Sequence, residues 1–197
     1  WMSERIIDFI CIDGVYPCSR NMIRVSEGGS AMNQSEKNLE RAFRKKAQEV
    51  LKYKLFAYRA SRENAPQIER LFRAAFEAGA VRAFNHLMAL YPAGDAADYL
   101  RESIEQETRE AETEYPKMLD DAKKEGDKSA EWSFTYGAAA EKLHAKLYSE
   151  ALEHFDELKD QEYSYFVCTS CGNIMEKEAP SQCPVCGTAR EQFITVD

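Results

Sequence analysis

Residues 134–152 read FTYGAAAEKLHAKLYSEAL, and the apolar and small residues in this stretch recur three or four positions apart. That spacing predicts one buried face of a long helix, which we place at about 127–158. Glu141 and His144 lie on the same face, three residues apart, so a carboxylate and an imidazole point toward one place. The stretch therefore predicts a helix that carries metal-ligand side chains toward the interior of a helical protein.

Three further segments upstream have the same helical period. They are about 36–60, about 65–90 and Ala96 to Gly126. Ser35 is a candidate cap for the first of them, and Pro66 suits the first turn of the second. Pro116 falls inside the last of these segments, and we expect a kink there. Four long amphipathic helices predict a helical bundle over residues 32–160, in which a long connection between the second and third helices is permitted.

The C-terminal tail contains two C-x-x-C turns, each followed by a glycine. They are Cys168-Thr169-Ser170-Cys171 and Cys183-Pro184-Val185-Cys186. Such turns bring four thiolates to one ion, and tetrahedral sulfur ligation suits zinc or a single iron. A module of this size buries too little apolar surface to fold alone, so metal binding must supply much of its stability. Residues 161–197 are therefore predicted to form a second, small domain that is held together by a metal ion.

Composition restricts the class of protein. The chain has 197 residues, 26 Lys+Arg against 34 Asp+Glu and a formal net charge of −8, which argues against a nucleic-acid-binding protein. The sequence has no apolar run long enough to span a membrane and no convincing secretory signal. Because the paired cysteines favour metal over disulfides, we expect a cytoplasmic protein. Residues 1–31 are given no fold, and Cys11 and Cys18 within them are interpreted as incidental thiols.

The third helical segment contains a second pair of ligand-type residues. Glu107 and Glu110 are three residues apart, as Glu141 and His144 are in the fourth segment. In di-iron bundles, one carboxylate helix and one E-x-x-H helix supply half of the site, and a repeat of that pair supplies the other half. The two segments thus provide one such half.

These features together resemble the rubrerythrin family. The resemblance covers about residues 32–197 and includes the helix order, the E-x-x-E and E-x-x-H pairs, Tyr115-Pro116 and the terminal C-x-x-C turns. It implies a mostly α protein, with a ferritin-like four-helix bundle followed by a small rubredoxin-like or zinc-ribbon-like β domain. It also implies peroxide reduction with electrons passing through the rubredoxin-type iron, a redox partner protein as electron donor, and a homodimer.

Matched position by position, the resemblance assigns only half of the bundle ligands. Four residues match family ligands, namely Glu107, Glu110, Glu141 and His144, and two tyrosines, Tyr53 and Tyr115, match residues near the family's site. Where the family has its remaining glutamates and histidine, this chain has Lys46, Gly79 and Arg82. We expect the two cations to pair with the bundle carboxylates, which leaves a metal-free, a mononuclear or a dinuclear site as alternatives.

Three functions follow from these alternatives. The first is an electron carrier with iron at Cys168, Cys171, Cys183 and Cys186 and with a bundle site that has lost half of its ligands. The second is an active peroxide reductase with iron in the bundle as well. The third is a zinc-stapled scaffold that binds a partner and performs no redox step.

Overall fold

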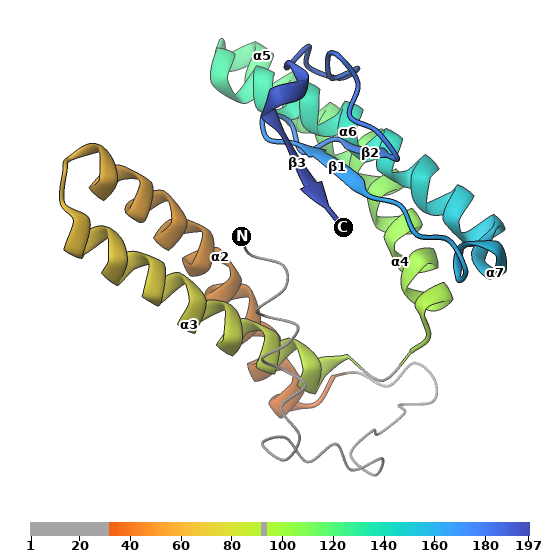
Figure 1. Ribbon diagram of the computed structural model, residues 1–197. Helices are drawn as coiled ribbons and strands as arrows, with labels where there is room; N and C mark the ends of the chain where they lie inside the picture. The colour runs from red at the N-terminus through yellow and green to blue at the C-terminus, as the bar shows by residue number, and fades with distance from the viewer. Residues whose placement is uncertain (1–31, 92–93) are drawn as a thin grey trace. The chain divides into compact units, whose positions relative to one another are not determined.

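The computed structural model describes residues 32–91 and 94–197, so the predictions made for residues 1–31 fall outside it (Figure 1). The described chain is mostly helical and ends in a small antiparallel sheet, which confirms the predicted fold class. Its described residues divide into two compact units, one within Trp1–Ala93 and one that comprises Gly94–Asp197. Each unit is built around a pair of long helices.

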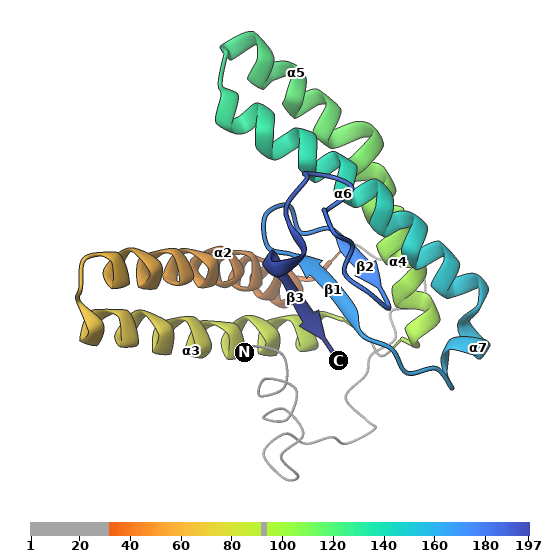
Figure 2. The same cartoon turned by 45° about the horizontal axis from the view of Figure 1, so that its top comes forward.

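The first unit is a helical hairpin of α2 (Gln34–Arg62) and α3 (Pro66–Leu90), which lie side by side in Figures 1 and 2. Asn33, and not Ser35, caps α2. Its side chain accepts from the Glu36 N–H, and the Glu36 carboxylate accepts from the Asn33 N–H, so two orphan donors are satisfied at once. The buried residues of the hairpin are small apart from one aromatic ring: Ala57, Ala60, Phe76, Gly79 and Ala83.

In the second unit, the third predicted helix is interrupted by a π-helix. The segment consists of α4 (Ala96–Arg109), the π-helix η1 (Glu110–Glu114) and α5 (Tyr115–Glu125). The predicted irregularity near Pro116 therefore begins one turn earlier than the proline. Pro116 has no N–H to donate, and the Tyr115 N–H reaches back five residues to the Glu110 carbonyl. Gly126 ends α5 with a φ of 71°.

The fourth helix is shorter than the sequence predicted. It comprises α6 (Lys128–Glu153), capped by Asp127, and a single further turn, α7 (Phe155–Leu158). The two-residue connection from α5 makes α6 antiparallel to the α4–α5 segment, and it packs along both α4 and α5 (Figure 2).

The tail forms a three-stranded antiparallel sheet in the order β2-β1-β3. Its strands are β1 (Tyr165–Cys168), β2 (Ile174–Glu176) and β3 (Phe193–Val196), and the short 3₁₀ turn η2 (Arg190–Gln192) leads into β3. Val167 pairs with Ile174 on one side and with Ile194 on the other. The first C-x-x-C turn begins at Cys168, the last residue of β1, and leads toward β2, whereas the second lies between β2 and η2.

Among the described helices, none is both long and apolar enough to cross a membrane.

Candidate metal centres

The sheet domain gathers all four tail cysteines into one cluster. The Sγ atoms of Cys168 and Cys186 lie 3.6 Å apart, and those of Cys171 and Cys183 are separated by the same distance. Sulfurs about 2.3 Å from a central ion in a tetrahedron lie about 3.8 Å from each other. The four thiols are free, and their spacing fits a single tetrahedral ion and no disulfide. The geometry therefore agrees with the four ligands predicted from the sequence.

The backbone of both turns is shaped to hold sulfur ligands. Gly172 and Gly187 have φ values of 80° and 76°, and their N–H groups donate to the carbonyls of Cys168 and Cys183. A residue with a Cβ rarely adopts this left-handed conformation, which explains the glycine after each C-x-x-C pair. The chain consequently reverses tightly enough to aim both sulfurs of a turn at one place.

Burial and local hydrogen bonds shift the pKa values of three of the four thiols in different directions. Burial raises the pKa of Cys171 and of Cys183. At Cys186 burial also opposes ionisation, but hydrogen bonds from the Thr188 hydroxyl and N–H outweigh it and lower the pKa to about 6. The Thr188 Oγ1 lies 3.1 Å from the Cys186 Sγ. The cluster thus has one thiol that ionises readily, from which metal binding can begin.

Sequence reasoning did not identify Asn173 as part of this site. Asn173 follows the first Cys-Gly turn, is fully buried, and accepts from the Cys168 N–H through its backbone carbonyl oxygen. A hydrogen bond from the Asn173 backbone to the Cys171 thiol acts to lower the pKa of Cys171, against the larger effect of burial. The only available signal was its position directly after Gly172. A buried residue at this point locks the turn that carries two of the ligands.

The second unit contains another cluster of ligand-type side chains, between α4 and α6. Single ligand atoms of Glu107, Glu141 and His144 all lie within 4.8 Å of one another. The His144 Nδ1 is 3.1 Å from the Glu141 Oε2 and 3.7 Å from the Glu107 Oε2. His144 is 9% exposed, although it is polar. The helices therefore bring together three of the four bundle ligands predicted from the sequence.

Two atoms of this cluster lack a hydrogen-bond partner within the described part of the chain. They are the Glu107 Oε2 and the His144 Nε2, and both are buried. Buried polar atoms are costly to leave unpaired, and both are atoms that ligate divalent metals. Burial, followed by the nearby carboxylates of Glu141 and Glu110, raises the pKa of Glu107 to about 8. The residues present therefore fit one bound cation, which would relieve this accumulation of carboxylates.

Glu110 does not join the three-residue cluster. It is the first residue of the π-helix, and its Oε1 accepts from the Gln106 Nε2 at 3.0 Å. The Glu110 N–H still donates to the carbonyls of Gln106 and Glu107, so the helical period is intact up to Glu110, and the side-chain hydrogen bond to Gln106 holds its carboxylate instead. Glu110 still contributes negative charge near Glu107 and Tyr115.

Two tyrosines border the carboxylate cluster. Burial and the charges of Glu141, Glu110 and Glu107 raise the pKa of Tyr115, and burial with Glu107 and Glu141 raises that of Tyr148. The predicted partner Tyr53 lies in the first unit, where its ring stacks 6.5 Å from that of Phe72. Protonated phenols next to the cluster are suited to donating hydrogen bonds to a bound oxygen ligand.

Family models match both parts of this architecture. The model described as rubrerythrin matches residues 37–152, and the model described as the rubredoxin-like domain of rubrerythrin matches residues 166–194. The chain belongs to the rubrerythrin family. Its tail is therefore a rubredoxin-like site of four cysteines, the type of site that binds iron in this family and whose ligands also accept zinc.

Individual relatives agree with this assignment. The chain is 30% identical over 158 residues to Rubrerythrin-2 of Clostridium acetobutylicum, an alignment that covers 73% of this chain and 86% of the relative. It is 35% identical over 104 residues to a putative rubrerythrin of Methanocaldococcus jannaschii, which covers 51% of each. A solved structure of partially reduced nigerythrin matches with a TM-score of 0.51 and 24% identity, covering 91% of this chain and 94% of the other. At that identity the structural likeness shows the fold alone.

The three positions at which the resemblance to the rubrerythrin family predicts replaced ligands, Lys46, Gly79 and Arg82, all lie in the α2–α3 hairpin. Lys46 is 19% exposed and pairs with Glu49 on its own helix. Arg82 is exposed, and its Nε donates to the Ala78 carbonyl at 3.1 Å. Pairing of these two cations with Glu107, Glu110 or Glu141 remains a prediction.

Gly79 is buried for a packing reason. A Cβ built on it would lie 2.8 Å from the Val50 Cγ2 and 3.8 Å from the Lys46 Cδ. The glycine thus lets α3 approach α2 closely, and a longer side chain at this position would require Val50 to move. The glycine at position 79 is therefore coupled to the packing of the hairpin.

Proposed function

We propose that this protein is a rubrerythrin-type redox protein in which iron at the four cysteines carries electrons and the helical site holds no more than one metal ion. The observation that supports this most directly is the ligand count. Glu107, Glu141 and His144 converge, whereas Lys46, Gly79 and Arg82 offer no anionic or imidazole ligand. Three protein ligands suit one ion with open positions, but are too few for two.

The protein's own groups define what each site does. Iron bound in the rubredoxin-like domain supplies a one-electron couple. The four sulfurs are fixed by a sheet and two rigid turns, so little ligand movement accompanies a change of charge. At the helical site, Glu107 binds a proton when no cation is present, because its pKa is raised to about 8. Tyr115 and Tyr148 remain protonated beside it.

We further propose a cytoplasmic homodimer that receives electrons from a redox partner protein. The support for this part is the family membership together with the free thiols. A peroxide reductase that uses iron in the helical site is the competing activity, and a zinc-bound scaffold is the competing non-redox role.

Metal counting tests the proposal. The protein is reconstituted anaerobically with ferrous iron, desalted and analysed for iron per chain, beside Cys171→Ser and His144→Gln. We expect one iron that Cys171→Ser removes, and at most one further iron that His144→Gln removes. Two irons per chain beyond the cysteine-bound one would contradict the single-ion site. A colourless protein that keeps zinc after purification from an iron-supplied host would contradict the electron-carrier role.

Peroxide consumption with an electron donor separates the two redox activities. We expect the unmodified protein and Glu141→Ala to consume peroxide at equal rates, because the helical site lacks a second metal. A rate that falls by a factor of ten or more in Glu141→Ala would show that the helical site reduces peroxide.

A further inference from the structure

The sheet domain of the tail carries a shallow hollow of about 310 Å³. Two half-buried aromatic side chains line it, Phe166 of β1 and Phe193 of β3, together with Thr195 of β3. Two exposed cations, Lys177 and Arg190, line it as well. This sheet hollow therefore combines aromatic surface with positive charge in one place.

The sheet hollow shares a face of the sheet with a cysteine ligand. In the antiparallel pair of β1 and β3, Phe166 lies opposite Thr195, and Cys168 lies opposite Phe193. Directly opposed residues have their side chains on the same face, as do residues two apart along a strand. The side chains of all four residues therefore lie on one face. A molecule that occupies the hollow contacts Phe193, the residue directly across from Cys168.

Positive charge in the tail is confined to the sheet hollow. Lys177 and Arg190 are the only basic residues within residues 161–197, and one acidic residue, Glu178, lines the hollow beside them. The same segment contains five acidic residues: Glu162, Glu176, Glu178, Glu191 and Asp197. Among the described residues, neither cation takes part in an ion pair. An acidic surface is therefore attracted to the hollow and repelled by the rest of the domain.

Both cations are held in place by their neighbours. The Arg190 Nε donates to the Pro180 carbonyl at 3.4 Å, and the Lys177 Nζ lies 5.1 Å from the centre of the Tyr163 ring. Lys177 has a φ of 66°, a left-handed conformation that is uncommon for a residue with a Cβ, and its N–H donates to the Ser164 carbonyl. Cations fixed in this way lose little conformational freedom when a partner binds.

We propose that the sheet hollow is the surface on which an acidic one-electron donor protein docks to reduce the tail iron. Aromatic and arginine side chains are among the residue types enriched in protein interfaces. The volume of the hollow is at the lower limit for a small-molecule pocket, which favours protruding carboxylates of a protein over a nucleotide. The inference rests on the proposed electron-carrier function for the electron step, whereas docking itself requires only a folded tail domain.

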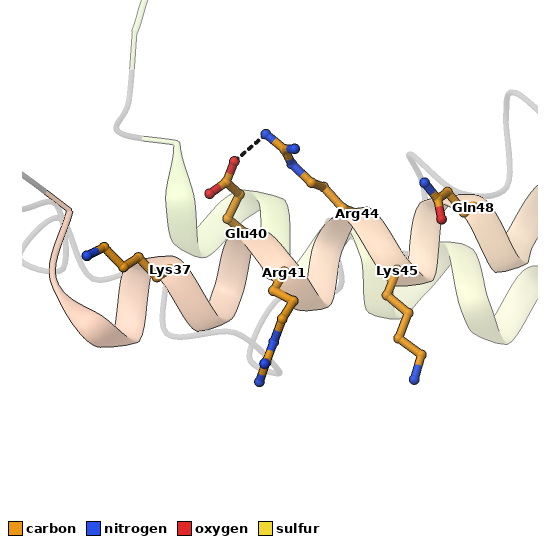
Figure 3. A pocket seen from close by; sticks show the side chains of 6 residues that line it. All are labelled: Lys37, Glu40, Arg41, Arg44, Lys45 and Gln48. Carbon is orange, nitrogen blue, oxygen red and sulfur yellow. Dashed lines mark hydrogen bonds and ion pairs between the residues drawn. The ribbon is translucent and has the colours of Figure 1, made fainter.

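A second basic surface, on α2, provides the control. Figure 3 shows Lys37, Arg41 and Lys45 extending from the helix beside another shallow hollow, where Arg44 pairs with Glu40. Every residue that lines this α2 hollow is charged or polar. Attraction between exposed charges alone is weak and is screened by salt. We therefore expect charge reversal on α2 to have little effect on docking of the donor.

Binding is measured with the zinc-loaded chain, because zinc occupies four cysteines without accepting an electron. The probe is oxidised flavodoxin, an acidic flavin protein, and a second sample of it has its surface carboxylates converted to amides. NMR titration of the isotope-labelled chain at low ionic strength reports the docking surface and the affinity. We expect shifts around the sheet hollow with the acidic probe and none with the amidated probe. Shifts confined to other residues, or no binding of the acidic probe, would overturn the docking surface.

Charge reversal tests the two cations directly. Lys177→Glu with Arg190→Glu should weaken binding of the acidic probe by about tenfold or more, whereas Arg41→Glu with Lys45→Glu should leave it nearly unchanged. The neutral pair Lys177→Gln and Arg190→Gln should have a smaller effect in the same direction, and its NMR spectrum shows whether the tail domain is folded. Equal weakening by the two charge-reversed pairs would overturn the assignment, because net charge alone would then explain the binding.

Stopped-flow reduction of the iron-loaded chain separates docking from electron transfer. One electron leaves the flavin of reduced flavodoxin, and the ferric centre becomes ferrous. We expect Lys177→Glu with Arg190→Glu to slow this reduction by about tenfold, and to have little effect on reduction by dithionite, which needs no protein surface. Equal slowing with both reductants would overturn the docking surface, and reduction by NADH alone that the variant abolishes would assign the hollow to a nucleotide. A tail iron that neither reductant reduces would contradict the electron-carrier function, while the zinc titration would still decide the docking.

Discussion

The ring of Tyr115 lies directly against the backbone of Gly137. A Cβ atom built on Gly137 would lie 2.9 Å from the Tyr115 Cζ and 3.2 Å from its Oη. This contact joins the first residue after the π-helix to the middle of α6, four residues before Glu141. Gly137 is thus required for the close approach of the tyrosine to the carboxylate cluster, although it lies in the interior of a helix, where glycine is unfavourable.

Gly137→Ala is expected to destabilise the protein even though alanine is the better helix former. Alanine gains about 1 kcal/mol of helix propensity over glycine. Its Cβ would overpack against the Tyr115 ring, which costs about 1–3 kcal/mol and outweighs that gain. Denaturant unfolding followed by far-UV circular dichroism measures the difference. In a Tyr115→Ala background the ring is absent, so there Gly137→Ala should stabilise. The same sign in both backgrounds would contradict the contact.

The raised pKa of Glu107 predicts a pH-dependent stability of the metal-free protein. In the folded state Glu107 holds its proton with a pKa of about 8, above the ordinary carboxyl value. The bound proton therefore stabilises the folded state fully below about pH 4.5, and this stabilisation is lost as the pH rises through about 8. The free energy of unfolding should therefore fall between about pH 5 and 8, and Glu107→Gln should flatten this slope.

Glu105→Gln is the matched control for this prediction, because Glu105 is exposed on the same helix. Urea unfolding of the chelator-treated protein at several pH values provides the measurement. An equal slope for Glu107→Gln and the unmodified protein would show that the proton is held elsewhere. A cation bound at the site requires the ionised carboxylate, so its affinity should rise with pH over the same range.

Thr188→Val is expected to lower the reduction potential of the iron-loaded tail. The Thr188 hydroxyl lies 3.1 Å from the Cys186 Sγ and donates to it when the sulfur is a thiolate ligand. Such a bond favours the reduced, more negative centre, and a loss of about 1 kcal/mol corresponds to roughly 40 mV for one electron. Thr169→Val is the control, since that hydroxyl donates to the Gln192 carbonyl. A potential that changes equally in both variants would contradict the assignment.

Removal of the tail metal is expected to unfold the sheet domain and leave the helices intact. The buried side chains of this domain are few, namely Cys168, Asn173, Ala179 and Cys183, and two of these are ligands. After chelation, limited proteolysis should cut within residues 161–197 while the helical circular dichroism signal remains. Cys171→Ser should behave in the same way without chelator. A large loss of helical signal in either experiment would show that the tail stabilises the helices.

The sequence predicted the features that depend on local spacing. The helical period of residues 134–152 and the two C-x-x-C turns identified the helices and the cysteine site, and both agree with the structure. Glu141 and His144 were predicted to meet because residues three apart lie on one helix face, and they do. That Glu107 meets them from another helix was implied by the resemblance to the rubrerythrin family, and the structure brings it to them.

Other features depend on interactions that spacing does not encode. The π-helix that begins at Glu110 has a shifted hydrogen-bond register before Pro116. The Glu110 carboxylate accepts from the Gln106 side chain and does not join the cluster. Asn173 is buried by the fold of the turn around it. Lys46 pairs with Glu49, a residue of its own helix, whereas its predicted partners were carboxylates of other helices.

The amino-acid order by itself determined which residues form helices and which four sulfurs can hold one ion, because these follow from residue type and period along a single segment. Only the tertiary structure decided that Gly79 and Gly137 are sites of close packing and that the Glu107 and His144 atoms are buried without partners in the described chain. Burial and close approach depend on what a second helix places opposite a residue, and no periodicity within one helix contains that information.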